Sequence, residues 1–171
     1  MDQIRLKTIP TFGTERLSLR QLADSDVEEI FLLRSDDLIN KYLGRQACRT
    51  WEDALGFIEK VKSNNLYYWA ITQKGNNKLL GTICLFNVSS ELSKGEIGYE
   101  LLTEYQGNGI MEESAIKIIQ FAFETLKLKA IDAYTHIENQ SSTDLLKRLN
   151  FSRIGGLYGA NSNLILFRLE N

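Results

Sequence analysis

Apolar and polar residues alternate along some segments of the chain and recur every three or four positions along others. Residues 16–22 alternate, which predicts a first strand. Residues 27–34 follow the helical spacing instead, and Asp24 or Ser25 would cap the helix that they predict. The helical pattern continues irregularly through residues 38–43. We therefore expect the chain to begin with a strand followed by a helix.

A second helix and a hairpin are expected next. Thr50 and Asp53 have the spacing of a capping box, with Asp in the acidic position, which predicts the start of a helix. Residues 66–72 and 78–87 have strand-like patterns. Between them, residues 74–77 read Lys-Gly-Asn-Asn, which are turn residues that tolerate positive φ angles. The two strands should therefore pair as a hairpin.

The most informative segment of the chain joins a strand-like pattern to a helical pattern across a glycine loop. Residues 96–102 alternate, and Gly107 and Gly109 follow them. The apolar positions that carry the helical pattern are Ile116, Ile119, Phe123 and Leu126. A Gly-Asn-Gly hairpin turn is the alternative, but residues 111–126 are rich in helix-forming types and contain no turn signal. The unpaired N–H groups of a first helical turn attract anions, so this loop predicts a phosphate site.

The remaining segments complete a mixed sheet. Residues 130–136 predict a strand, residues 139–149 a short helix, and residues 151–157 and 163–169 a final pair of strands. The order is β-α-α-β-β-β-α-β-α-β-β, an antiparallel run with one strand-helix-strand crossover. We expect an α/β (α+β) fold with a mostly antiparallel sheet of about seven strands and about four helices. A ligand would sit beyond the end of the strand at residues 96–102.

Composition limits the classes of function. The 171 residues, 43% of them apolar, predict one domain, 1–171, with its core at about residues 14–169. A net charge of −2 with interspersed signs argues against a nucleic-acid partner. The absence of an apolar run of roughly 18 residues argues against a membrane partner, and we expect a cytoplasmic protein. His136, Cys48 and Cys84 are too few and too scattered for a metal site or a Ser-His-Asp triad.

The two best-known phosphate motifs do not fit the glycine loop. A dinucleotide fingerprint requires a third glycine where this chain has Glu112, and the Walker pattern is absent. The chain does contain Gln106-Gly-Asn-Gly109-Ile-Met111, which has the form Q-x-x-G-x-[G/A] apart from its last residue. After the crossover come Asn139-Gln-Ser-Ser142 and Leu145-Leu-Lys-Arg-Leu-Asn-Phe151.

Together these motifs resemble the GNAT acetyltransferase superfamily. The segments 95–99, 104–109 and 121–124, with Glu113 and the N-x-x-S spacing, resemble its RimJ/RimL branch more closely. The resemblance covers about residues 14–169. It implies an acyltransferase that uses acetyl-CoA as donor, an amine as acceptor and no metal.

The resemblance also implies roles for individual residues. The main-chain N–H groups of the loop would bind the CoA pyrophosphate; the loop consists of Gln106, Gly107, Asn108, Gly109, Ile110 and Met111. The strand end from Glu100 to Leu102, with Leu101 and Leu102 as its binding residues, would pair with the pantetheine arm, and Asn139 would hydrogen-bond that arm. Ser142 would lie near the thioester sulfur.

Three positions depart from the family pattern. Met111 replaces a small residue, which would tighten or reshape the approach to the phosphate. Asn150 stands where the family usually has glycine, and asparagine is the non-glycine residue best able to keep a positive φ angle. Leu146 replaces the tyrosine that serves many members of the superfamily as general acid.

Acetyl transfer to an amine needs a neutral amine, a donor for the developing oxyanion and a proton for the thiolate. The main chain near Leu101 is a candidate donor. Glu100 is the candidate base, because it ends the strand on the face shared with Glu96; a solvated strand carboxylate is the alternative. Ser142 is the candidate thiolate partner, with helix capping as the alternative. His136 is interpreted as a surface residue.

The acceptor stays open at this stage. A peptide or protein N-terminal α-amine and a small amine such as a polyamine or aminoglycoside both fit direct transfer in a ternary complex. A non-catalytic CoA-binding or sensing domain and an interaction module without a CoA site are the alternatives from other classes. The glycine-containing segment 155–163 is expected to border the acceptor. The oligomeric state is open, and a homodimer is compatible with the sequence.

Overall fold

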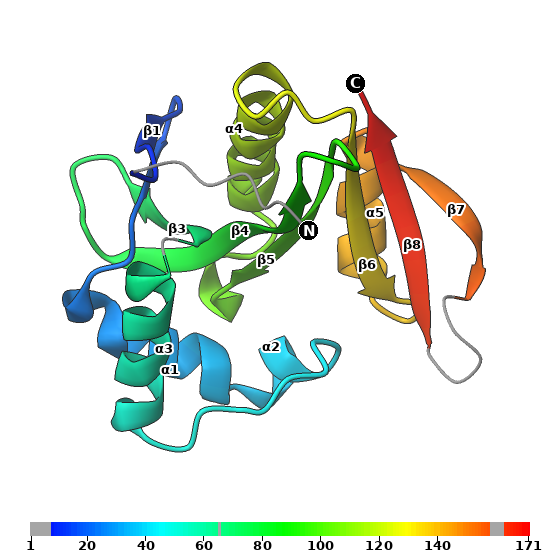
Figure 1. Ribbon diagram of the computed structural model, residues 1–171. Coiled ribbons are helices and arrows are strands. Elements are labelled where there is room, and N and C mark those ends of the chain that lie inside the picture. Colours follow the sequence, from blue (N-terminus) through cyan, green and yellow to red (C-terminus); the bar gives the residue numbers. More distant parts are fainter. Residues whose placement is uncertain (1–7, 65, 158–162) are drawn as a thin grey trace.

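The computed structural model describes residues 8–64, 66–157 and 163–171, and within them the chain forms eight strands and five α-helices (Figure 1). The strands are β1 (Phe12–Gly13), β2 (Leu17–Arg20), β3 (Tyr67–Gln73), β4 (Leu79–Ser89), β5 (Lys94–Leu101), β6 (Ala130–His136), β7 (Ser152–Leu157) and β8 (Leu164–Glu170). The helices are α1 (Val27–Ser35), α2 (Asp37–Asn40), α3 (Trp51–Ser63), α4 (Ile110–Glu124) and α5 (Gln140–Arg148).

All strands belong to one mixed sheet with the order β1-β2-β3-β4-β5-β6-β8-β7. Strand β5 pairs with β6 in parallel across the α4 crossover, and the other neighbouring strands pair antiparallel. The predicted fold class, element order and crossover are confirmed. The short strand β1 and the single-turn helix α2 raise the totals above the seven strands and four helices expected.

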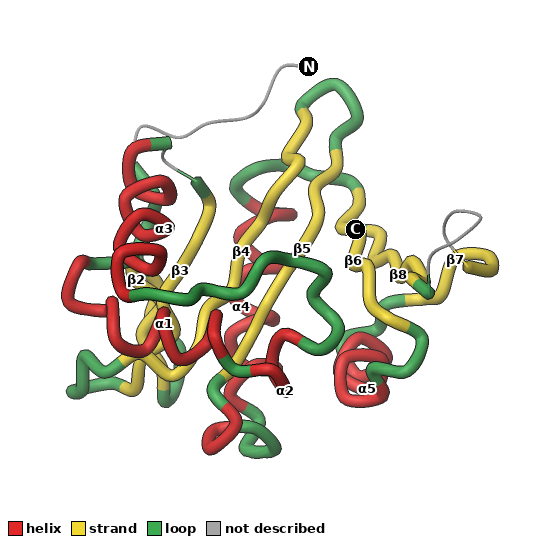
Figure 2. The backbone as a smooth tube through the Cα atoms, turned by 90° about the horizontal axis from the view of Figure 1, so that it is seen from below, coloured by secondary structure: helices red, strands yellow, loops and turns green. Residues whose placement is uncertain are grey.

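Helices cover both faces of the sheet (Figures 1 and 2). One apolar cluster lies between the sheet and helices α4 and α5, and includes Trp69, Ile118 and Leu146. A second cluster lies against α1 and α3 and includes Leu33 and Ile58. Neighbouring side chains of each central strand therefore enter different clusters, as the alternation of a half-buried strand requires.

The predicted cap of the first helix was wrong, whereas the capping box of α3 is confirmed. Neither Asp24 nor Ser25 caps α1. The N-cap residue of α1 is Asp26, whose side chain makes no capping hydrogen bond to α1 but pairs with Arg20 and accepts from the Ala23 N–H at 2.8 Å. At α3, Thr50 and Asp53 exchange the expected hydrogen bonds. A short 3₁₀ turn at residues 24–26 precedes α1, so α1 begins after both of the residues that were expected to cap it.

Helix α4 packs through smaller residues than its apolar pattern indicates. Ile116 is 56% exposed, although it belongs to that pattern. The buried face is built by Met111, Ser114, Ala115, Ile118, Phe121 and Ala122. Small residues let the helix axis approach the sheet closely, and they contribute little to a hydrophobic pattern. The position of the helix was therefore predictable, and the orientation of its face was not.

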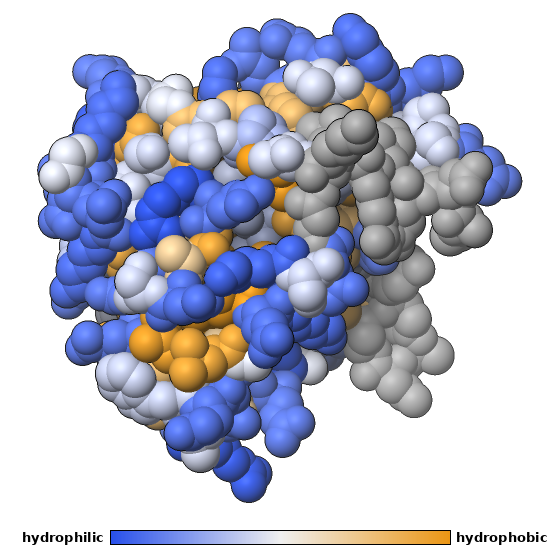
Figure 3. All heavy atoms as spheres, turned by 60° about the vertical axis from the view of Figure 1, so that its left-hand side comes forward, coloured by the Kyte–Doolittle hydropathy of each residue, from blue (hydrophilic) through white to orange (hydrophobic). Residues whose placement is uncertain are grey.

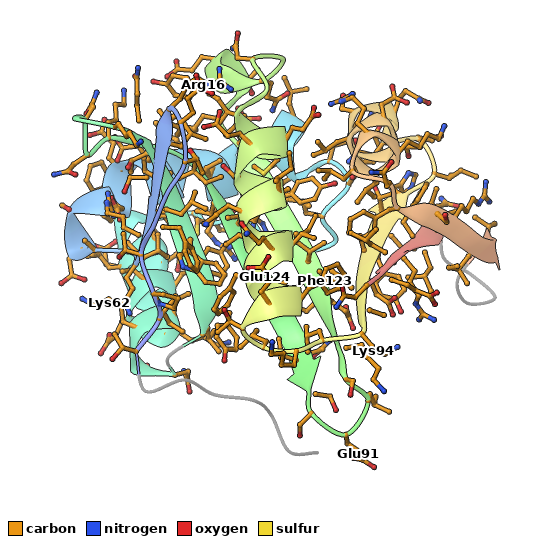
Figure 4. The ribbon with its side chains drawn as sticks, turned by 90° about the horizontal axis from the view of Figure 1, so that it is seen from above. Arg16, Lys62, Glu91, Lys94, Phe123 and Glu124 are labelled. Atoms are coloured by element: carbon orange, nitrogen blue, oxygen red, sulfur yellow. The ribbon has the colours of Figure 1, made fainter. Side chains whose placement is uncertain are left out.

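Strands β5 and β6 pair only where they begin. Their register covers residues 94–96 opposite 130–132, while β6 continues to pair with β8 along its whole length. Asp132, 1% exposed, holds the paired end through Lys94 of β5 at 3.1 Å and Arg168 of β8 at 2.6 Å. Lys94 lies far from the start of α4 in Figure 4. Beyond the pairing the two strands diverge (Figure 2), and the divergence opens toward the glycine loop.

The face shown in Figure 3 is mainly hydrophilic, with an apolar area in its lower half. Exposed large apolar side chains on α1 and α3 include Leu32, Trp51 and Leu55. The Trp51 ring stacks on Phe31 at a centroid distance of 6.3 Å, which ties the two helices together. Among the described residues, no helix combines the length and the apolar character needed to cross a membrane.

Candidate active site

The glycine loop ends in a helix N-terminus that is open to an anion. Gly107 and Gly109 have φ angles of 76° and 74°, and a Cβ at Gly107 would meet nothing within 4 Å. The first backbone hydrogen bond of α4 runs from the Glu113 N–H to the Gly109 carbonyl, and none of the described side chains caps the helix. The N–H groups of residues 110–112 therefore lack helical acceptors. This geometry fits a phosphate group.

Two residues from the start of the chain hold the loop in place. Glu113 accepts hydrogen bonds from the Thr14 hydroxyl at 2.6 Å and from the Arg16 Nε at 2.7 Å. Arg16 also donates to the Asn108 carbonyl at 3.1 Å, and Figure 4 shows it beside the first turn of α4. Burial acts to raise the pKa of Glu113, but the hydrogen bonds from Thr14 and Arg16 lower it overall. The role of Arg16 was missed, because nothing in the sequence relates positions 97 residues apart.

The second acidic residue of the first turn is paired as well. Glu112 accepts a hydrogen bond from the Arg148 Nε on α5 at 2.8 Å. The two carboxylates that could repel an incoming phosphate are thus each matched by an arginine. The same contact ties the C-terminal end of α5 to the loop.

Met111 does not obstruct the loop. Its side chain is 8% exposed and lies in the apolar cluster beneath α4, so only its main chain faces the anion site. Gln106 Nε2 donates to the Leu101 carbonyl at 3.0 Å, and Asn108 Nδ2 donates to the Gln106 carbonyl at 3.1 Å. The loop is therefore fixed by its own side chains to the end of β5.

The open edge of β5 excludes one residue that was expected to bind the pantetheine arm. The Leu102 N–H donates to the Leu80 carbonyl of β4 at 3.0 Å, and the Leu102 side chain lies in the cluster against α1 and α3. Since main-chain groups alternate between the two sides of a strand, those of Tyr99 and Leu101 face the diverging side. Leu101 and Tyr99 are therefore the candidates for pairing with an extended ligand at this edge, whereas the Leu102 N–H is already used within the sheet.

Tyr99 and Ser142 join β5 to α5 across the divergence. Their hydroxyl oxygens lie 2.9 Å apart. Burial raises the pKa of Tyr99 to about 12, although the hydrogen bond with Ser142 acts in the opposite direction. The cap of α5 is Asn139, whose Oδ1 accepts from the Ser142 N–H at 3.2 Å. The Ser142 hydroxyl is therefore not the cap, and Leu146 is fully buried in the core.

Glu100 points to the opposite face of β5 from Tyr99. It is 7% exposed, and one carboxylate oxygen lies 2.5 Å from Arg45 Nη2. The other oxygen accepts hydrogen bonds from the Thr82 hydroxyl at 3.0 Å and the Tyr68 hydroxyl at 3.3 Å. The alternative of a solvated strand carboxylate was wrong, because the segment after α2 covers this position. Arg45 gave no sequence signal, since it lies in an irregular loop.

Two further groups lie near Glu100. The Cys84 thiol donates to the Gly98 carbonyl, and burial together with Glu100 raises the pKa of Cys84 to about 12. A thiol that stays protonated is a poor nucleophile. The guanidinium of Arg34 lies over the Phe57 ring at 3.9 Å from its centroid.

His136 lies at the far end of β6 and is half-buried rather than fully exposed. Its ring stacks on Tyr42 at a centroid distance of 4.9 Å, and its Nδ1 accepts from the Glu138 N–H. This contact connects the segment after α2 with the diverging end of β6. The aromatic residues Tyr67 and Trp69 belong to the core, whereas Phe86 is 43% exposed.

Neither a metal cluster nor the cavity near Tyr68 adds to this site. Within the described parts of the chain, no group of three or more His, Cys, Asp or Glu residues is arranged to hold a metal. A cavity of about 270 Å³ near the end of α3 borders Tyr68, but Glu100 and Ser142 do not line it. Residues 158–162 of the segment expected to border the acceptor lie outside the described residues.

The chain is similar to known proteins in its sequence and in its fold. The family model for the acetyltransferase (GNAT) domain matches residues 16–152. The uncharacterized N-acetyltransferase YoaA of Bacillus subtilis (strain 168) is 32% identical over 154 residues, 86% of this chain and 86% of that protein. The ribosomal protein uS5 alanine N-acetyltransferase of Escherichia coli (strain K12) is 27% identical over 107 residues, 61% of this chain and 55% of that enzyme. The crystal structure of a GNAT-family acetyltransferase from Bacillus anthracis, 23% identical, has the same fold, with a TM-score of 0.85 over 94% of this chain and 98% of that chain.

Proposed function

The chain belongs to the GNAT acetyltransferase family and is an acyltransferase, and we propose that it moves the acetyl group of acetyl-CoA directly to a primary amine. One observation carries this proposal. Where β5 and β6 diverge, β5 presents Tyr99, whose hydroxyl group lies next to Ser142 of α5, on one face and Glu100 on the other. A thioester lying along this edge would have hydroxyl groups on one side and a carboxylate on the other.

The donor would be held from the loop to the strand edge. The N–H groups of residues 110–112 would bind the pyrophosphate, together with the backbone of Gly107 and Gly109. The pantetheine arm would pair with the main chain of Tyr99 and with the carbonyl of Leu101, as an added strand pairs with a sheet edge, and the Leu101 N–H would stay available. Asn139, whose amide nitrogen donates to no described residue, would contact the same arm. The pantetheine arm would thus pair with the part of β5 that does not pair with β6.

The chemistry requires three groups around the thioester. The amine would approach from the Glu100 side, and Glu100 would accept its proton directly or through a water molecule. The Leu101 N–H, which faces the diverging edge, would stabilise the developing oxyanion. Ser142, oriented by Tyr99, would donate a proton to the departing thiolate of CoA and regain one from water, while Glu100 releases the amine proton to water.

The pKa of the acceptor amine determines how much free energy its deprotonation requires. An α-amine with a pKa of about 8 is partly neutral near pH 7.5, whereas a lysine with a pKa of about 10.4 would cost roughly 4 kcal/mol to deprotonate. Glu100 already interacts with Arg45 and two hydroxyl groups, so a modest base is what the site offers. We therefore favour an α-amine or a comparably acidic amine over an internal lysine.

A protein N-terminus is one acceptor that fits this preference. The E. coli relative is named for the N-acetylation of an alanine of ribosomal protein uS5. A small amine is the second candidate, because Arg45 and Tyr68 both contact the Glu100 carboxylate and leave little of it exposed. Both candidates use the same donor site and the same base.

The proposal is tested by mixing the protein with acetyl-CoA and a panel of amines. The panel contains short peptides with free N-termini, N-terminally blocked peptides that carry lysine, polyamines and aminoglycosides. Free thiol release and the mass of the acceptor are followed together. We expect release that depends on an amine and a matching acetyl adduct on that amine. Hydrolysis of acetyl-CoA without any adduct across the panel would contradict the proposal.

A further inference from the structure

Two arginines surround the carboxylate of Glu100. Arg45 contacts it directly, and Arg34 is connected to it through two rings. The Arg34 guanidinium lies on the Phe57 ring, the Phe57 ring meets the Tyr68 ring edge-on at 5.4 Å, and the Tyr68 hydroxyl lies 3.3 Å from Glu100. One carboxylate and two guanidinium groups thus share the face of the sheet from which the amine would approach.

The two guanidinium groups differ in their hydrogen-bond partners. Arg45 donates from Nη2 to the Leu33 carbonyl and from Nε to Asn40 Oδ1, in addition to its ion pair. Arg34 donates no hydrogen bond to any described residue, and its buried Nε has no partner. A buried N–H donor without an acceptor is unfavourable unless a ligand supplies one.

The same charges act together on a neighbouring thiol. After burial, the charges that influence the pKa of Cys84 are those of Glu100, Arg45 and Arg34. The two arginines act on it against Glu100. The two arginines and Glu100 therefore lie close enough together to act on one small region.

We propose that the acceptor carries an anionic group beside its amine, and that Arg34 binds this group while the amine meets Glu100. The inference rests on the proposed acetyl transfer and narrows its acceptor class. A guanidinium group offers parallel N–H donors that match a carboxylate or a phosphate. A polyamine would instead bring a second cation toward two arginines, which is repulsive.

Matched acceptors that differ only in charge test this inference. One pair is an α-amino acid and its carboxamide; the other is Ala-Asp and Ala-Asn, both with amidated C-termini. We expect kcat/KM to be about tenfold or more higher for the anionic member of at least one pair, since hydrogen bonds to charged groups contribute that much. The first pair tests whether a free α-carboxylate is recognised, and the second pair tests whether an acidic side chain is recognised. Spermidine is the cationic comparison.

The variant Arg34→Gln tests whether the Arg34 side chain causes the preference for the anionic acceptor. The ratio of the two rates within one preparation is independent of the folded fraction, so a partly unfolded variant remains informative. We expect the ratio to fall to about one in Arg34→Gln. Arg49→Gln, which removes an exposed arginine from the loop before α3, should keep the ratio of the unaltered protein.

Three results would overturn the inference while leaving acetyl transfer intact. These are equal rates for both members of each pair, faster acetylation of spermidine, and a preference that persists in Arg34→Gln. A complete lack of amine-dependent thiol release would instead contradict the proposed function itself, and this inference with it.

Discussion

Glu100 is the side chain on which the proposed chemistry depends most. It is buried, and Arg45, Thr82 and Tyr68 hold both of its oxygens. We expect Glu100→Gln to lower kcat/KM about 100-fold near pH 7, in the range of a lost general base. The deficit should shrink as the pH rises toward the pKa of the acceptor amine, because more of the amine is then already neutral.

The matched control for this change is Glu96→Gln. Glu96 lies on the same face of β5, and its carboxylate accepts a hydrogen bond from Asn87 at 2.9 Å. Initial rates measured from pH 6 to 9 compare the two variants. If Glu100→Gln were as active as Glu96→Gln across this range, Glu100 would not be the base.

The Tyr99 and Ser142 hydroxyl groups should act as one unit. We expect Ser142→Ala to lower kcat about tenfold, because the thiolate loses its proton donor. Tyr99→Phe should give part of this loss, and the double variant should be no slower than Ser142→Ala alone. Because the pKa of Tyr99 is raised to about 12, Tyr99 should stay protonated from neutral pH to pH 10. Losses that multiply in the double variant would show independent roles.

Part of the proposed site was expected from the sequence. The strand pattern indicated Glu100, and the family resemblance indicated Ser142, Asn139 and the loop glycines. Arg16, Arg34 and Arg45 do not, because each acts on a residue that only the fold brings near. Their charge could be read from the sequence, but their partners could not.

At the scale of single elements, the glycine loop and α4 can be tested together. Gly107→Ala and Gly109→Ala should each lower the free energy of unfolding by about 1 kcal/mol, because alanine is strained at positive φ. Gly109→Ala also brings a Cβ to 3.4 Å from Arg16 Nη2. Both variants should bind CoA more weakly in calorimetric titrations, since the N–H groups of the loop lose their arrangement.

Gly56→Ala is the control for these two variants. Gly56 lies inside α3 with open space around it and no positive φ angle, so alanine there should raise the free energy of unfolding by about 0.5–1 kcal/mol. CoA affinity should not change. Unaltered CoA binding in both loop variants would remove the loop from the donor site.

The elements themselves were largely predictable, since local patterns specify them. Capping at Thr50, the hairpin between β3 and β4, and the positive φ angle of 64° at Asn150 all follow from short-range preferences. Strand β1 has only two residues, too short to show a pattern. The buried face of α4 depends on Ala115 and Ala122, whose burial is decided by the sheet above which they lie.

At the scale of the whole molecule, Asp132 fixes the point from which β5 and β6 diverge. Burial acts to raise the pKa of Asp132, but the hydrogen bonds from Arg168 and Lys94 outweigh it and lower the pKa below its ordinary value of 3.8. The stability that the charged form contributes is therefore complete above about pH 4. It is lost as the pH falls through the lowered pKa of the folded state.

Asp132→Asn tests this account by urea unfolding at several pH values. We expect it to lower the free energy of unfolding by about 3 kcal/mol at pH 7, the low end for a broken buried pair, because Lys94 and Arg168 partly reach solvent. The difference from the unaltered protein should shrink below pH 4. Asp144→Asn, at an exposed site on α5, should change little at either pH. A pH-independent difference would show that packing, not charge, is what Asp132 provides.

The direct transfer of an acetyl group to an amine is the central claim, and one single-turnover experiment tests it. The protein is mixed with equimolar acetyl-CoA, with and without the best acceptor amine, and thiol release and the mass of the intact protein are recorded. The account predicts rapid release only with the amine, an acetylated amine and an unmodified protein, Cys84 included. A burst of thiol without amine, accompanied by an acetyl adduct on the protein, would contradict it.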